Sequence, residues 1–163
     1  MEKAVFSRDT FVDCPEAERK KDFHRFLEFA FGYADGFTLS YGKPGFKAGA
    51  PELDDFQSSR WGYLAESVYD YECTNESPVT TGPPVLLLYF RFDDVTKKFL
   101  RERTGIYDFG GYELKSPNTK GLNCRWLWDL ALLKEGKIFF ISCTHERFCS
   151  IDEDVLIKFR QGK

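Results

Sequence analysis

The chain has few of the residues on which most catalytic and metal-binding motifs depend. Its 163 residues include two histidines, one methionine and five cysteines, none of them spaced as Cys-x-x-Cys. That spacing is needed for zinc ribbons and thioredoxin-like redox sites, so both classes are excluded. The longest apolar run, VLLLYF at 85–90, is far shorter than the roughly 20 residues of a membrane-spanning helix. No stretch matches a cofactor motif, and we expect no cofactor and no contact with a membrane.

The composition is that of a folded protein. The chain is 42% hydrophobic and contains 17 Phe, 8 Tyr and 3 Trp, ample material for one packed core, so we expect a single globular domain over residues 1–163. The opening MEKAVFSRDTF has charged residues before any apolar stretch long enough for a signal peptide. Dispersed cysteines in odd number are typical of reduced thiols, and we expect the protein to be cytoplasmic.

The net charge of −3 conceals an uneven distribution. Residues 51–96 carry nine acidic and two basic side chains, whereas residues 97–163 carry nine acidic and thirteen basic ones. An acidic middle third can attract a basic partner, although a solvated face is the simpler explanation of such a run. The basic residues of the segment 97–103 suit the C-terminal end of a short helix, and we expect no nucleic-acid binding.

Two segments indicate how the chain folds. Asp13, Pro15 and Glu16 are typical helix-start residues, and the apolar spacing that follows predicts one long helix over about 15–34, with Phe23, Phe26, Leu27 and Ala30 on its core face. In the last third, alternating apolar residues on both sides of Glu135-Gly136 predict a β-hairpin with Leu132 facing Phe139 and Leu130 facing Ile141.

Several shorter segments complete the predicted fold. Phe37–Tyr41, Val85–Phe90 and Val155–Arg160 read as strands, SPVTTGPP at 77–84 as a loop, and DDVTKKFLRERTG as a short helix with an aspartate cap. We therefore predict an α+β protein with a mainly antiparallel sheet of five or six strands, covered by the long N-terminal helix and one or two further helices.

The predicted hairpin also suggests two chemical sites. Its register places Cys124, Cys143 and His145 on one face with Cys149 in reach, and thiolate and imidazole are ligands that zinc prefers. The spacing matches no common zinc module, so packing in the core is the default and no metal is predicted. A Cys143/His145 pair could instead support a small enzyme, provided that the strand end is distorted and open to solvent.

The stretch ESVYDYECTNE at 66–76 combines four acids with two tyrosines and has no basic residue. The purely structural explanation is that this stretch is the polar end of a helix or an edge strand, whose tyrosines pack their rings inward and keep their hydroxyls in solvent. As a site, its tyrosines are anchors among carboxylates that suit a cationic protein. We predict that the partner-binding residues are Glu66, Tyr69, Asp70, Tyr71 and Glu72, extended by Asp54, Asp55 and Trp61.

A small acidic chain with such a surface and no catalytic motif has the general character of bacterial immunity proteins, which neutralise a toxin by covering its active site. The sequence therefore predicts a stoichiometric inhibitor, and not an enzyme, whose partner is a basic protein such as a nuclease toxin domain. The alternative is the small Cys/His-dependent enzyme with its site near Cys143 and His145.

Overall fold

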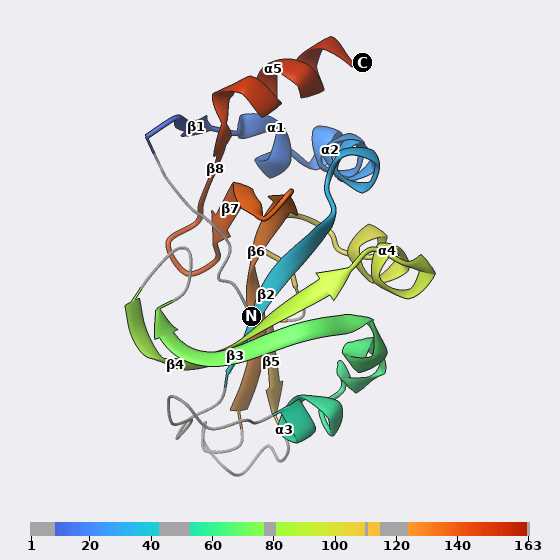
Figure 1. The fold of residues 1–163 in the computed structure, drawn as a ribbon, viewed down its shortest axis with the longest axis vertical. Helices are drawn as coiled ribbons and strands as arrows, with labels where there is room; N and C mark the ends of the chain where they lie inside the picture. The colour runs from blue at the N-terminus through green and yellow to red at the C-terminus, as the bar shows by residue number, and fades with distance from the viewer. Residues whose placement is uncertain (1–8, 43–52, 77–80, 110, 115–123, 163) are drawn as a thin grey trace.

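The computed structural model describes residues 9–42, 53–76, 81–109, 111–114 and 124–162. This part of the chain forms eight strands, five α-helices and one 3-10 helix (Figure 1). In chain order they are β1 (Phe11–Asp13), α1 (Pro15–Glu18), α2 (Lys20–Tyr33), β2 (Gly36–Gly42), α3 (Leu53–Gln57), η1 (Gly62–Ser67), β3 (Val68–Glu76), β4 (Thr81–Arg91), α4 (Asp94–Arg101), β5 (Gly111–Leu114), β6 (Cys124–Lys134), β7 (Lys137–Cys143), β8 (Phe148–Asp152) and α5 (Glu153–Gln161).

The strands form one antiparallel sheet. Seven of them follow the order β1-β8-β7-β6-β2-β4-β3, and β5 pairs with the first residues of β6, beyond the segment that β7 pairs. Among the described strands, β1 and β3 are therefore the outermost. In Figure 1, α1, α2 and α5 gather at the end of the molecule where β1 and β8 lie, and α3 lies at the opposite end.

The two faces of the sheet differ. Every helix contributes buried side chains to one large cluster that includes Phe23, Phe26, Leu100 and Phe159, so the helices cover one face. A smaller cluster on the other face consists of strand residues alone, with Leu87, Tyr89 and Ile141 among them. The α+β class and the antiparallel sheet agree with the prediction, but the number of strands was underestimated, because β1 and β5 are too short to show an alternating pattern.

The single long helix predicted over about 15–34 is divided into two helices. Arg19 has an extended backbone with ψ of 129°, and this breaks the segment into the four-residue α1 and the longer α2. Cys14, not Asp13, is the N-cap of α1, and no side chain caps it. Glu16 turns to pair with Arg160 of α5 instead of closing a capping box. The predicted core stripe of α2 is confirmed, since Phe23, Phe26, Leu27 and Ala30 are all buried.

The hairpin is confirmed in its turn and wrong in part of its register. Glu135 and Gly136 both have positive φ, 51° and 77°, as a two-residue type I′ turn requires. Leu133 pairs with Ile138, but a bulge then shifts the ladder, so that Leu132 faces Phe140 and not Phe139, and Ile141 faces Ala131 and not Leu130. Such a one-residue shift cannot be seen in the alternating pattern, because both strands are apolar on both faces there.

Two other predictions are corrected. The segment Val155–Arg160 is not a strand but part of α5, which Asp152 caps and in which Val155, Leu156 and Phe159 are buried at helical spacing. The predicted loop at 77–84 is strand from Thr81 onward, in β4. The ladder between β3 and β4 is irregular between Thr74 and Glu76, and a proline fits into such an irregular ladder because its missing N–H is not needed there.

The predicted aspartate-capped helix is confirmed as α4. The Asp93 side chain accepts a hydrogen bond from the Thr96 backbone N–H, and the Thr96 hydroxyl accepts one from the Asp93 backbone N–H. None of the helices in the described part of the chain has the length and apolar character of a membrane-spanning segment.

Candidate functional site

The predicted partner-binding stretch forms the corner where η1 runs into β3. The chain leaves the 3-10 helix at Ser67 and enters the outermost described strand at Val68. Ser67 is held there by a 2.5 Å hydrogen bond from its hydroxyl to Asp93, the cap of α4. Burial alone would raise the pKa of the Asp93 carboxyl, but hydrogen bonds from Ser67 and Thr96 outweigh burial and lower this pKa. The corner is thus fixed to α4 by an ionised group.

Tyr69 is the most informative residue of this corner. The residue is 52% exposed, and its ring packs edge-on against the ring of Tyr89, with 6.1 Å between the two ring centroids. Burial of the ring's inner part raises the pKa of the hydroxyl, and the nearby charges of Asp70 and Asp35 raise it further. An aromatic ring half in solvent therefore lies near two carboxylates.

Both carboxylates are held in position by backbone donors. Asp70 accepts a hydrogen bond of 2.8 Å from the Tyr71 N–H, and Asp35 accepts one of 2.6 Å from the Glu135 N–H. Asp35 is exposed and comes from the segment between α2 and β2. It was not among the predicted site residues, because its position near Tyr69 depends on the sheet order, in which β4 lies between β2 and β3.

The other predicted residues divide into exposed and inward-facing sets. Glu66 and Asp54 are exposed, and Glu72 is half-buried. Tyr71 also is half-buried, and it packs on the large core cluster, on the opposite side of β3 from Asp70 and Glu72. Arg91 is a basic neighbour of the corner, since its guanidinium donates a 2.7 Å hydrogen bond to the carbonyl of Glu66.

Two of the predicted residues are engaged inside the protein. Trp61 is only 3% exposed and belongs to the core. Asp55 forms an ion pair of 3.4 Å with Arg125, which is itself buried, and accepts a hydrogen bond from the Tyr41 hydroxyl. Sequence reasoning could not assign this pair, because 70 positions separate the two residues of the ion pair. Trp61 and Asp55 are therefore not available as an exposed binding surface.

The Cys143/His145 pair comes together in the turn after β7. The Cys143 thiol lies 3.7 Å from Nδ1 of His145, closer than a regular strand allows, because residues 144–147 form a turn. Asp129 lies nearby in a left-handed conformation with φ of 61°, fixed by reciprocal hydrogen bonds with Thr144. Cys143 is fully buried, and this burial raises the pKa of its thiol. The environment therefore suppresses the thiolate that a nucleophile needs.

The conceivable zinc site is not assembled. Cys149 pairs with Ser142 in the ladder, so its side chain is on the helix-covered face together with Cys14. Cys143 is the next residue along β7 and is directed to the other face. The side chain of Cys124 lies outside what the structure describes. Within the described residues, no group of three or more His, Cys, Asp and Glu side chains could hold a metal ion.

The structure also has a cleft of about 540 Å³ between β1, the β6–β7 turn and the start of α5. The ammonium groups of Lys134 and Lys158 lie 5.0 Å and 5.4 Å from the ring centre of Tyr33 on its wall. Asp152 and Asp154 line the same cleft. Because charges of both signs surround it, the cleft favours no one class of cofactor.

These features define a small α+β protein in which an exposed tyrosine lies near two fixed carboxylates. Comparisons with known proteins add no relative: no protein-family model matches the chain, and no curated protein or solved structure matches it significantly.

Proposed function

We propose that the protein is a stoichiometric inhibitor that binds a basic protein through the η1–β3 corner, here defined as Glu66, Tyr69, Asp70, Glu72 and Asp35. The observation that carries the proposal is the position of Tyr69, half exposed and close to two carboxylates that backbone N–H groups hold in place. The general character shared with bacterial immunity proteins supports a toxin domain, such as a nuclease, as the partner.

The corner has the properties of a binding hot spot. A tyrosine loses little conformational entropy on binding, and the packing of Tyr69 on Tyr89 restricts its ring already in the free protein. Lysine and arginine bind aromatic faces and carboxylates alike, so one cationic side chain of the partner can engage Tyr69, Asp70 and Asp35 together. The acidic charge of residues 51–96 also increases the rate of encounter with a basic surface.

The first experiment is a capture assay with immobilised protein and lysate of the source cell, at about 50 mM and about 500 mM salt. The test variants are Tyr69→Ala and the double variant Asp35→Asn/Asp70→Asn, in which the amide oxygens can still accept the backbone hydrogen bonds. The matched control is Ile157→Ala, because Ile157 is 46% exposed on α5, a different element. We expect one basic protein to be retained by wild type and control at low salt, and lost by both test variants.

The captured protein is then purified and titrated. A hot-spot tyrosine contributes about 2 kcal/mol or more, so Tyr69→Ala should weaken Kd by about 30-fold. A stoichiometric inhibitor should abolish the partner's activity at one equivalent. Equal capture by wild type and Tyr69→Ala, or a captured protein whose activity is unaffected, would contradict the proposal.

The second candidate is the small enzyme at Cys143 and His145, favoured by their 3.7 Å contact. It requires a reactive thiol of low pKa, whereas burial, together with the charges of Asp129 and Glu146, raises the pKa of Cys143. Labelling with iodoacetamide across pH 6–9 distinguishes the two functions. Slow labelling of Cys143 throughout this range excludes the enzyme, whereas rapid labelling at pH 6 that the variant His145→Ala removes would favour it.

A further inference from the structure

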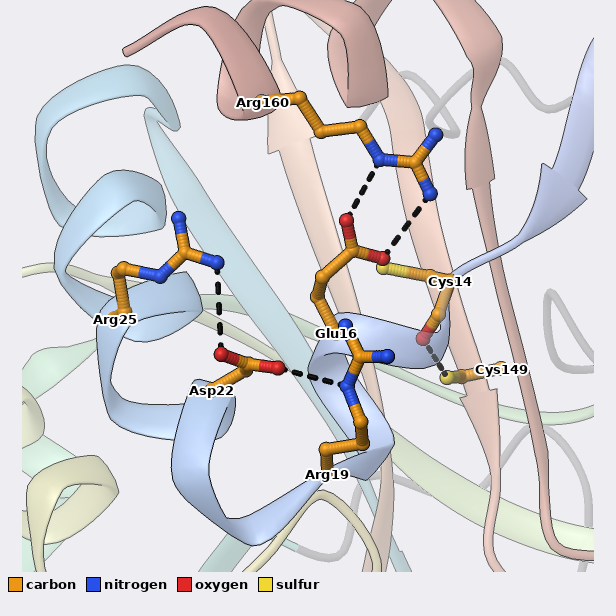
Figure 2. Close-up of polar contacts among 7 residues, drawn as sticks. All are labelled: Cys14, Glu16, Arg19, Asp22, Arg25, Cys149 and Arg160. Carbon is orange, nitrogen blue, oxygen red and sulfur yellow. Dashed lines mark hydrogen bonds and ion pairs between the residues drawn. The ribbon is translucent and has the colours of Figure 1, made fainter. Parts of the chain in front are cut away.

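Cys14 and Cys149 lie opposite each other at the end of the β1–β8 ladder. Asp13 pairs with Ser150 in this antiparallel ladder, and the next step brings Cys14 level with Cys149. Directly opposed residues have Cα atoms about 4.5–5.5 Å apart, within the range of about 4.4–6.8 Å that a disulfide spans. The Cys149 thiol lies 3.3 Å from the carbonyl oxygen of Cys14, so the two residues are in contact (Figure 2).

The side chains share one face of the sheet. Both belong to the helix-covered core cluster, where Cys14 is 1% and Cys149 2% exposed. Figure 2 shows that the Cys149 thiol is directed at the backbone of Cys14, whereas the Cys14 thiol is directed toward Glu16. The disulfide therefore forms after Cys14 rotates about its Cα–Cβ bond.

Both thiols stay protonated in the closed protein, because burial raises the pKa of Cys14 and of Cys149, and the charge of Glu18 raises that of Cys149 further. The Glu18 carboxylate, on an exposed residue, lies 3.6 Å from the Cys149 sulfur, and the same oxygen accepts a 3.0 Å hydrogen bond from the Tyr107 hydroxyl. The Cys149 thiolate therefore forms only when this part of the protein opens to solvent. Access is provided by β1, a three-residue strand at the edge of the sheet, since short edge elements open locally at low free-energy cost.

We propose that Cys14 and Cys149 are a disulfide-forming pair that locks β1 onto β8 when a small-molecule disulfide is present. When β1 opens, the Cys149 thiol is exposed and loses its proton to solvent, and the resulting thiolate attacks one sulfur of the small disulfide, whose S–S bond breaks and releases one thiolate. The Cys14 thiol then loses its proton, and its sulfur displaces the second small thiolate from Cys149. Two protein thiols are oxidised to one cystine, and the small disulfide is reduced to two thiols.

The lock joins residues 135 positions apart and fixes the strand that precedes α1. A cross-link that closes so long a segment restricts the unfolded chain strongly, so the oxidised protein should unfold at a temperature about 5 °C higher or more. This inference does not depend on the proposed inhibitor function.

The test uses the full chain, reduced and then incubated with glutathione disulfide, once folded and once during refolding from urea. Remaining thiols are labelled with a maleimide after denaturation, and peptides are mapped without reductant. The five cysteines should give five labels before oxidation and three after it, with one cross-linked peptide pair that contains Cys14 and Cys149. Dithiothreitol should restore all five labels.

Single serine variants test which cysteines form the cross-link. Cys14→Ser and Cys149→Ser should each lose the cross-link and retain glutathione on the remaining cysteine, whereas the matched controls Cys73→Ser and Cys143→Ser should keep the cross-link. If a serine variant does not fold, the peptide map of the oxidised wild type still tests whether Cys14 and Cys149 are cross-linked. Five free thiols after both treatments, stable glutathione adducts on wild type, or a cross-link between other cysteines would each overturn the proposal.

Discussion

The ion pair between α1 and α5 offers a stability prediction that can be worked out in detail. Arg160 donates from Nε to Glu16 Oε2 at 2.7 Å and from Nη2 to Oε1 at 3.2 Å (Figure 2). The Glu16 side chain is 7% exposed and the Arg160 side chain 54%. Removing one partner of a fully buried pair costs about 3–5 kcal/mol, but water can reach this guanidinium. We therefore expect Arg160→Ala to lower the free energy of unfolding by about 2 kcal/mol, the range of a charged hydrogen bond.

The stability that this ion pair contributes should depend on pH. The hydrogen bonds from Arg160 lower the pKa of the Glu16 carboxyl in the folded protein. A carboxyl with a lowered pKa contributes stability above its unfolded pKa of about 4.3, and that stability disappears as the pH falls through the folded value. The difference between wild type and Arg160→Ala should therefore be largest at pH 7 and shrink in acid.

Urea unfolding of both proteins at pH 7 and near pH 3 measures this difference. The double variant Glu16→Gln/Arg160→Ala completes a double-mutant cycle, in which we expect a coupling free energy of about 1 kcal/mol or more. If Arg160→Ala lowers the free energy of unfolding by less than about 0.5 kcal/mol at pH 7, or by the same amount at both pH values, the ion pair is a solvated contact that contributes little to stability.

Three further substitutions test the frame that carries the η1–β3 corner. Gly36→Ala should destabilise the protein by about 1–3 kcal/mol in urea unfolding, because the new Cβ would lie 2.5 Å from the Phe90 carbonyl oxygen; an unchanged midpoint would refute the packing of β2 on β4. Asp93→Ala removes the capping box of α4 with Thr96 and should cost about 1–2 kcal/mol, and Asp93→Asn should recover part of it; equal losses in the two variants would contradict the capping role. Glu135→Asn should stabilise the protein by about 0.5–1 kcal/mol, because asparagine tolerates the positive φ of this turn position better; a lower thermal midpoint would contradict the type I′ assignment.

Local signals in the sequence predicted the elements that depend on their own residues. The core stripe of α2, the Glu135-Gly136 turn and the cap of α4 were all correct, since each follows from spacing or capping within a few residues. The error in the N-terminal helix occurs where a distant segment determines the local structure. The break at Arg19 accompanies the pairing of Glu16 with Arg160, a residue 144 positions away.

The error at the C-terminus has a different cause. Val155–Arg160 is short and rich in β-branched and aromatic residues, a composition that favours a strand. Its helical character comes from Asp152, which caps α5, and from the acidic Glu153 and Asp154, which complement the positive end of the helix dipole. These three residues directly precede Val155, so capping signals in the sequence could have predicted this helix.

The candidate site shows why a contiguous stretch is a poor guide to a surface. Neighbouring residues of a strand point to opposite faces, so Asp70 and Glu72 lie on one side of β3 and Tyr71 packs into the core on the other. The second carboxylate near Tyr69 comes instead from Asp35, brought there by the pairing of β2 and β3 with the two edges of β4. A partner would therefore recognise charges from segments far apart in sequence. If binding depends on Asp35 as much as on Asp70, the fold and not the acidic run creates the site, and a peptide of residues 66–76 should not compete for the partner.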